Sequence, residues 1–330
     1  MEFVRLTKKI FLSLLIVVTF VIVAGFIYEQ ISRSIVDDKF PAQGDFASID
    51  DHKLHYIRKG TMAPTVVFDS GLGDGVFSWF KIQNKVSEYT STISYDRAGI
   101  LWSERGSSPK SSKQISADLH ELLIKSKAQK PYIIVAHSLS GLTLRNYISE
   151  HNEDILGVVF VDVSHPDQLN RFPKNAGSLI SEIPDWLINF GNHIGVVRLF
   201  FNLTYPNTNE NDPINIRVNA LRSKSIPATL EERLNFVSIA NEAANINTFG
   251  NIPLVIITGA SPDRFKYLKN KTLEKQFNSI WSELQKDLLK LSSNSKQILA
   301  TKSGHTVQME QPEVVIESII QIILKYKSKH

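Results

Sequence analysis

Short apolar segments alternate with helical patterns over most of the chain. Six of these segments are continuous runs, rich in β-branched and aromatic residues, rather than runs that alternate with polar positions. Continuous runs of this kind are typical of parallel strands that are covered on both faces. The runs lie at residues 65–68, 92–95, 132–135, 158–161, 254–257 and 297–299.

Segments between the runs carry apolar residues at helical spacing, at residues 116–127, 139–150, 273–291 and 312–326. Residues 46–58 instead alternate between apolar and polar positions around Asp50 and Asp51, which predicts a hairpin ahead of the first parallel strand. Strands and helices in this order predict an α/β fold, in which helices flank a sheet.

Residues 166–245 interrupt the order. No strand run of the same kind occurs there, and aromatic residues are concentrated in the segment. We interpret the segment as an inserted, mainly helical cap that helps to shape a substrate pocket. The alternative is a second core layer that only stabilises the sheet. The aromatic residues are Trp186, Phe190, Phe200, Phe201 and Tyr205.

Near the N-terminus, residues 10–28 form an apolar run that follows Lys8 and Lys9 and precedes Glu29 and Arg33. The run is long enough to cross a bilayer. Positive charge before the run favours a cytoplasmic N-terminus, which places the rest of the chain on the other side of the membrane.

We therefore predict a single-pass anchor at residues 1–28, a tether at residues 29–45 and an extracytoplasmic domain at residues 46–330. The small residues Ala24 and Gly25 could end a signal peptide instead. In that alternative the peptide is cleaved and the protein is secreted.

The composition suits one large domain with its own core, since 42% of the 330 residues are hydrophobic and 21% are charged. The net charge of +4 does not indicate nucleic-acid binding, and nothing in the sequence indicates a protein partner. The sequence contains no cysteine, which excludes disulfides, thiolate metal sites and cysteine nucleophiles. The sequence also lacks a cluster of ligands at metal-site spacing, so we expect no metal site, and we expect no organic cofactor.

Ser138 is the candidate nucleophile. It lies in the segment HSLSG at residues 137–141, directly after a strand run and directly before a helical pattern. This is the setting of a nucleophile elbow, a strained turn that lifts a serine hydroxyl above the sheet. The turn needs small residues two positions before and after the serine. Ala136 and Ser140 are small enough, although glycine is usual at both positions.

A serine nucleophile needs a base within hydrogen-bonding distance, because its hydroxyl is not nucleophilic at its own pKa. His305, in Ser303-Gly304-His305, follows the last strand run and precedes the last helical pattern. A loop in that position can reach the elbow across the edge of the sheet. We therefore predict His305 as the base.

The run at residues 65–68 leads into a glycine-rich loop, SGLGDG at residues 70–75. Backbone N–H groups in such a loop can point at an anion. We predict that the N–H of Leu72, together with the N–H of Leu139, forms an oxyanion hole. The alternative is a tight turn without a catalytic role.

With these features the chain resembles the α/β-hydrolase superfamily over residues 46–330. The segment YDRAG at residues 95–99, with Ser103, resembles the superfamily's Y-D-x-x-G-x-G-x-S segment, except that Leu101 stands where the second glycine is usual. The resemblance implies a mostly parallel eight-stranded sheet flanked by helices, with a helical cap inserted after the sixth strand. It also implies the chain order serine, acid, histidine.

The resemblance leaves two candidates for the acid that orients the histidine. Asp162 ends the strand run at residues 158–161, and a minority of the superfamily takes its acid from that place. Asp263 follows the run at residues 254–257, where the acid is more usual, but it lies one position beyond the commonest spacing. We take Asp162 as the first candidate and Asp263 as the alternative.

A serine at the elbow argues against haloalkane dehalogenases and epoxide hydrolases of this fold, which use an aspartate there. The resemblance thus implies a carboxylesterase or lipase-like enzyme, which cleaves small or lipid-like esters through an acyl-enzyme on Ser138. A ligand-binding sensor on the same scaffold is one alternative. An aminopeptidase of this fold is another, in which acidic residues of the cap would bind the substrate amine: Glu231, Glu232 and Glu242.

Overall fold

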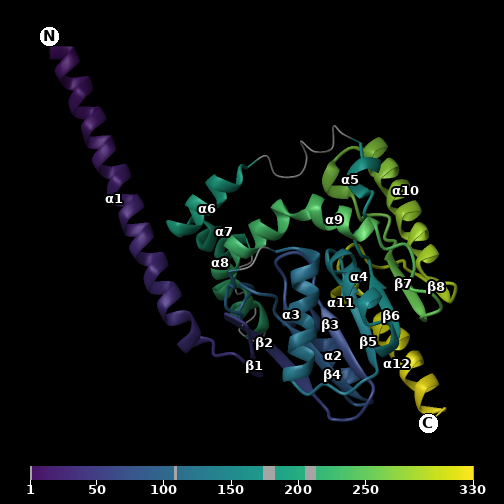
Figure 1. Cartoon of the computed structure of the whole chain (residues 1–330). Coiled ribbons are helices and arrows are strands. Elements are labelled where there is room, and N and C mark those ends of the chain that lie inside the picture. Colours follow the sequence, from purple (N-terminus) through teal and green to yellow (C-terminus); the bar gives the residue numbers. More distant parts are fainter. Residues whose placement is uncertain (1, 108–109, 174–182, 205–212, 330) are drawn as a thin grey trace. The chain divides into compact units, whose positions relative to one another are not determined.

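The computed structural model describes residues 2–107, 110–173, 183–204 and 213–329, and the chain divides into two compact units (Figure 1). One unit comprises Gln43–Glu182 and Ala228–His330. The other comprises Met1–Ala42 and Ile183–Pro227. We refer to them as the sheet unit and the N-terminal unit.

The sheet unit is built on eight strands in the order β1-β2-β4-β3-β5-β6-β7-β8. The hairpin pair β1–β2 and the pair β2–β4 are antiparallel, and every other pair is parallel. The predicted hairpin and the mostly parallel eight-stranded sheet are therefore confirmed. The strands are β1 (Asp45–Ile49), β2 (His52–Lys59), β3 (Thr65–Asp69), β4 (Ser91–Tyr95), β5 (Tyr132–His137), β6 (Ile155–Val161), β7 (Leu254–Gly259) and β8 (Ser295–Ala300).

Helices cover both faces of the sheet, as the continuous apolar runs predict (Figure 1). Helices α3 (Ser112–Lys125) and α4 (Ser140–Glu150) pack on one face. Helices α2 (Phe80–Val86) and α12 (Pro312–Lys327) pack on the other face. Shorter or peripheral helices are η1 (Val76–Trp79), η2 (Asn152–Asp154), η4 (Lys266–Leu268), α10 (Lys271–Asp287), η5 (Leu288–Leu291) and α11 (Val307–Glu310).

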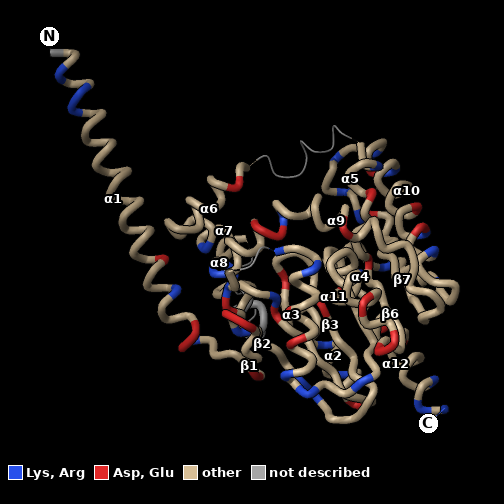
Figure 2. The backbone as a smooth tube through the Cα atoms, viewed as in Figure 1, with Lys and Arg blue, Asp and Glu red and all other residues tan. Residues whose placement is uncertain are grey.

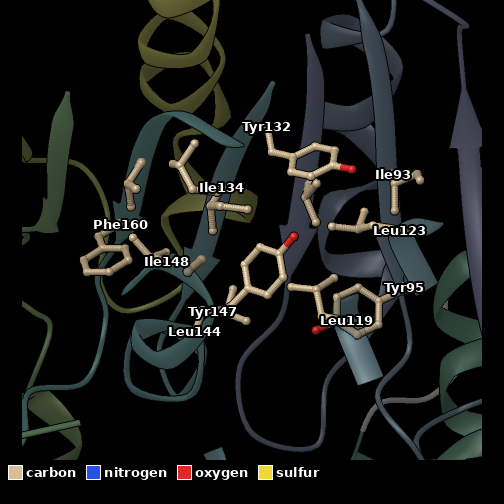
Figure 3. Close-up of a cluster of buried hydrophobic side chains, with 14 of the residues drawn as sticks. Ile93, Tyr95, Leu119, Leu123, Tyr132, Ile134, Leu144, Tyr147, Ile148 and Phe160 are labelled. Carbon is tan, nitrogen blue, oxygen red and sulfur yellow. The ribbon is translucent and has the colours of Figure 1, made fainter. Parts of the chain in front are cut away.

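The core divides according to the two-residue period of the strands. Along β5, Tyr132 and Ile134 point to the face that α3 and α4 cover, where Figure 3 shows them with Leu119 and Tyr147. Ile133 and Val135, between them in sequence, belong to the core cluster on the opposite face. Both faces of β5 are therefore fully buried.

A helical region follows β6, in agreement with the predicted insertion after the sixth strand. The predicted cap covers residues 166–245, of which 174–182 and 205–212, including Tyr205, lie outside the described residues. The helices are α5 (Gln168–Arg171), α6 (Asp185–His193), α7 (Val196–Thr204), α8 (Pro213–Leu234) and α9 (Phe236–Ala244).

In the N-terminal unit, α1 runs without a break over Glu2–Lys39. Most of the predicted tether, residues 29–45, therefore continues the helix, in which Glu29 and Arg33 pair one turn apart at 2.7 Å. From Phe3 to Lys39 the helix is apolar and long enough to cross a membrane, with a mean hydropathy of 3.0 over its most apolar stretch. Figure 2 shows that charged residues lie near its two ends. These properties are compatible with a membrane anchor or a signal sequence.

Candidate active site

Strand β5 ends in a strained turn at Ser138, which has a φ of +53° in the left-handed region. Helix α4 begins two residues later. The hydroxyl of Ser140 accepts a hydrogen bond from the His137 N–H at 2.7 Å and lies 3.0 Å from the Asp69 carbonyl. Ala136 and Ser140 are fully buried, so the turn accommodates both residues that replace the usual glycines.

Three strand-end loops bring Ser138, Asp162 and His305 together. Ser138 follows β5, Asp162 follows β6, and His305 lies between β8 and α11. The Ser138 Oγ lies 3.0 Å from His305 Nε2, and His305 Nδ1 lies 2.6 Å from Asp162 Oδ2. The three side chains thus form a continuous hydrogen-bonded chain at the carboxyl edge of the sheet, the place where open α/β sheets bind ligands.

The carboxylate of Asp162 is fully buried and accepts four hydrogen bonds. Besides His305, the donors are the Gly259 N–H at 3.0 Å, Trp281 Nε1 at 2.9 Å and Arg264 Nη2 at 2.5 Å. Burial by itself raises the pKa of Asp162, but the Arg264 charge and the hydrogen bonds from His305 and Arg264 outweigh it and hold the pKa below its usual value. The carboxylate therefore stays ionised beside the imidazole.

Arg264 was not singled out from the sequence, because nothing in its local pattern marks it. Its Nη1 donates to the carbonyls of Gly259 and Gly304, and its guanidinium lies 4.5 Å from the centre of the Trp281 ring. Arg264 Nη2 is also 3.4 Å from His305 Nδ1. A fixed positive charge thus stands beside both members of the Asp162–His305 pair.

The alternative acid, Asp263, lies elsewhere. Its side chain is 71% exposed, and its Oδ2 is 3.7 Å from Lys266 Nζ on the surface. The structure therefore brings Asp162 to His305 and does not bring Asp263 there.

Two further residues hold the loop that carries His305. His137 Nε2 donates to the His305 carbonyl at 3.0 Å, and burial together with His305 lowers the pKa of His137 to about 3, so its ring stays neutral. Glu310 accepts hydrogen bonds from the Gly304 N–H at 2.6 Å and the Ser303 hydroxyl at 3.1 Å. The sequence pattern gave no reason to assign either His137 or Glu310 a role at the site.

The predicted oxyanion loop lies against the nucleophile. A Cβ atom placed on Gly71 would lie 3.1 Å from Ser138 Cβ and 3.0 Å from His137 Nδ1, so the backbone there approaches the elbow closely. Leu72 follows Gly71 directly, and Leu139 immediately precedes the first turn of α4. Backbone N–H groups at a helix start can bind negative charge.

A cluster of buried charged side chains around Arg97 holds the same loop in place. Arg97 donates to the Asp69 carboxylate at 2.6 Å, to Glu232 at 2.7 Å and to the Gly71 carbonyl at 2.7 Å. Glu232, on α8, also accepts a hydrogen bond from the Gly73 N–H at 3.0 Å. The loop is thus fixed by charged side chains that stand 135 residues apart in the sequence.

The acidic residues considered for binding a substrate amine are in part already paired. Glu232 is fully buried against Arg97, and Glu231 pairs with Arg105 at 3.0 Å. Glu242 Oε1 lies 3.5 Å from the Ser238 hydroxyl. Within the residues that the structure describes, no group of three or more histidine, aspartate or glutamate side chains is arranged to hold a metal ion.

The segment after β4 has a structural role. Asp96 accepts hydrogen bonds from the Val76 N–H at 2.9 Å and from His55 Nδ1 at 2.7 Å, while the Ser103 hydroxyl donates to the Asp96 carbonyl at 2.6 Å. Leu101 adopts a φ of +45°, which explains why a glycine is usual at its position.

Comparison with known proteins agrees with the fold. Residues 64–191 match a family model described as the alpha/beta hydrolase fold. A thermophilic esterase from Thermogutta terrifontis aligns with a TM-score of 0.60 at 15% identity, over 86% of this chain and 99% of that one. The haloalkane dehalogenase DatA from Agrobacterium tumefaciens aligns with a TM-score of 0.60 at 14% identity, over 86% and 96% of the chains. At such identities the likeness shows the fold alone.

A protein named as a probable transporter in Hormonema carpetanum is 25% identical over 286 residues, which cover 81% of this chain. The chain spans only 40% of the length of that relative. The relative's name therefore describes a much longer protein.

Proposed function

Because this chain is a member of the α/β-hydrolase superfamily, we propose that it is a serine hydrolase that cleaves carboxylic esters through an acyl-enzyme on Ser138. The observation that carries the proposal is the hydrogen-bonded chain from Ser138 through His305 to Asp162, at 3.0 Å and 2.6 Å. A nucleophile, a base and an orienting acid in this order are what acyl transfer requires.

In the proposed reaction, His305 Nε2 takes the proton of the Ser138 hydroxyl as Oγ attacks the ester carbonyl carbon. Asp162 accepts the Nδ1–H of His305, which fixes the tautomer and stabilises the imidazolium. The N–H groups of Leu72 and Leu139 donate to the developing oxyanion. The alcohol leaves with the proton from Nε2, and a water molecule, deprotonated by His305, then releases the acid.

The side chain at the elbow favours ester hydrolysis over the reaction of the dehalogenase with the same fold. Displacement of a halide by Ser138 would give an ether, which attack by water at a carbonyl cannot cleave. An acyl group on Ser138 leaves a carbonyl for that attack. The Ser138–His305 contact at 3.0 Å is the arrangement that an active serine hydrolase requires.

The N-terminal helix leads us to propose that the enzyme is held in a membrane by α1, with the N-terminus in the cytoplasm and the sheet unit outside. Lys8 and Lys9 precede the apolar run and support this orientation. A small or lipid-like ester close to the membrane surface would be the substrate.

A fluorophosphonate probe on the full-length chain in detergent tests the proposal, because the probe reacts only with an activated serine. We expect labelling of the wild type, none of Ser138→Ala, and at least about tenfold slower labelling of Asp162→Asn than of the surface control Asp263→Asn. Short and long p-nitrophenyl esters would then define the acyl preference. A folded wild type that neither labels nor hydrolyses any ester would overturn the proposal in favour of the sensor.

A further inference from the structure

Helices α6 and α7 carry large apolar side chains that are exposed, while one polar side chain of each helix is buried. Asn192 is 0% exposed and Arg198 is 5% exposed, whereas Trp186 and Leu203 are 70% and 71% exposed. A helix of a water-soluble domain normally turns its large apolar side chains toward a core. The exposed apolar side chains of these two helices therefore call for an apolar partner.

The exposed residues lie on one side of each helix. In α7 they are spaced three and four residues apart, so they share a helical face. We call the following set the α6–α7 face: Trp186, Leu187, Phe190, Leu199, Phe200 and Leu203. A group of large exposed apolar side chains marks an interaction site rather than ordinary surface.

Buried charges fix the polar side of these helices to α1, within the same unit. Arg198 Nε and Nη2 lie 2.7 and 3.1 Å from the Glu29 carboxylate, and Nη2 also donates to the Ser223 hydroxyl at 2.6 Å. Arg33 approaches Glu29 at 2.7 Å, and Asn192 donates to the Ser223 carbonyl at 3.0 Å. These hydrogen bonds and ion pairs hold α7 against the part of α1 around Glu29.

Glu29 lies directly after the apolar run at residues 10–28. The connection between α6 and α7 touches α1 at Gly25, where a Cβ atom would lie only 2.5 Å from the Ile194 carbonyl oxygen. Gly195 approaches the Tyr28 ring in the same way. The run at residues 10–28 is about 28 Å long at 1.5 Å per residue, close to the thickness of a bilayer core. The helix pair therefore meets α1 where a membrane span would reach the headgroups.

We propose that the α6–α7 face is embedded in the interfacial layer of the bilayer that α1 spans, so that lipid covers it. The proposal rests on the anchor in the proposed function, because α1 sets the depth of the helix pair. Tryptophan, phenylalanine and leucine are the residues that in-plane membrane helices insert. Arg198 on α7 and Glu29 on α1 are buried against each other, so neither of these charges faces the lipid.

The experiment uses single cysteines, which the cysteine-free sequence allows without background. The full-length chain is reconstituted into phosphatidylcholine–phosphatidylglycerol vesicles with an environment-sensitive fluorophore on Thr19→Cys, Phe200→Cys or Lys125→Cys. These positions lie in the span, on the α6–α7 face and on the exposed surface of α3. Spin-labelled phosphatidylcholine should quench the first two labels at least about twofold and leave the third unchanged.

Intrinsic fluorescence gives a second readout without labels. Trp186 is exposed, whereas Trp79, Trp102 and Trp281 are at most 7% exposed. Brominated lipids should quench the wild type, and Trp186→Phe should lose that quenched component.

The outcomes separate the two proposals. Quenching at Thr19→Cys without quenching at Phe200→Cys would overturn the docking and leave the anchor intact. Quenching at Phe200→Cys alone would refute the span and, with it, the docking depth that α1 is proposed to set, and quenching at neither would refute both. A Phe200→Cys label that is shielded from aqueous iodide but unaffected by the spin-labelled lipid would also overturn the docking, since protein would then cover the face.

Discussion

The cation beside the proposed catalytic pair offers a quantitative test. Arg264 Nη2 lies 3.4 Å from His305 Nδ1 and 2.5 Å from Asp162 Oδ2, so Arg264→Gln removes one charge from the pair. Without that charge the Asp162 carboxylate loses a large part of what lowers its pKa, while its burial still raises the pKa. The pair then binds a proton more readily. The acid limb of the pH–rate profile should therefore move to higher pH.

The distance sets the size of the shift. At 3.4 Å, two unit charges interact with about 1.2 kcal/mol in water and about 5 kcal/mol at an effective dielectric constant of 20. The His305 side chain is 45% exposed, so screening by water favours the lower end of that range. An effect of about 1.4 kcal/mol corresponds to about one pH unit.

The assay is kcat/KM for a p-nitrophenyl ester between pH 4 and pH 9. Lys266→Gln is the matched control, because it removes the same charge from a 68% exposed side chain two residues along. Arg264→Lys keeps the charge and should shift the limb less than Arg264→Gln. If the acid limbs of Arg264→Gln and Lys266→Gln coincide with that of the wild type, while Asp162→Asn is inactive, the electrostatic reasoning is refuted.

Stability should change in the same direction. Since the pKa of Asp162 is depressed in the folded protein, its ionisation stabilises the fold above the pKa of the unfolded chain, and this contribution is lost as pH falls through the folded value. In Arg264→Gln the folded pKa of Asp162 is higher, so this contribution should be smaller and its loss should be complete at a higher pH, which thermal unfolding at several pH values would detect.

Two other substitutions test the backbone. Gly71→Ala should slow fluorophosphonate labelling by about 10²-fold, because the new Cβ would press on Ser138 and shift the loop. This is the usual effect of losing an oxyanion donor. Unchanged labelling would refute that placement of the loop. Lys127 lies two residues after the end of α3 and has a φ of +54°. Its N–H bonds to the Ile124 carbonyl and the Ala128 N–H bonds to the Leu123 carbonyl, which is a Schellman arrangement. Lys127→Gly should therefore raise the free energy of unfolding by about 1 kcal/mol in urea titrations, and Lys127→Ala should not.

The sheet could be predicted because each buried strand is a continuous apolar run with a clear end. The run at residues 132–135 and the helical pattern after it define the turn at Ser138 without any knowledge of other segments. Position along the chain also brings His305 close, since loops at the carboxyl ends of parallel strands meet at one edge. The local pattern of apolar residues was enough to predict the position of a residue wherever that position depends only on its own strand or loop.

The remaining residues depend on contacts between distant segments. Asp162 and Asp263 both follow strands at the same edge, and only the donors around Asp162, Arg264 among them, distinguish them. The Arg97–Glu232 pair joins residues 135 positions apart. No spacing rule relates such partners, because their meeting depends on how the whole sheet unit packs.

The hydroxyl of Ser140 has a consequence for finding related sequences. Ser140 occupies a position where a glycine is expected, and its hydroxyl accepts a hydrogen bond from the His137 N–H. The sharp turn therefore tolerates this side chain, because its oxygen forms a hydrogen bond with the turn. Searches that require glycine on both sides of the nucleophile will pass over chains built in this way. A pattern of alanine, glycine or serine at those two places, read together with the preceding strand, would retrieve them.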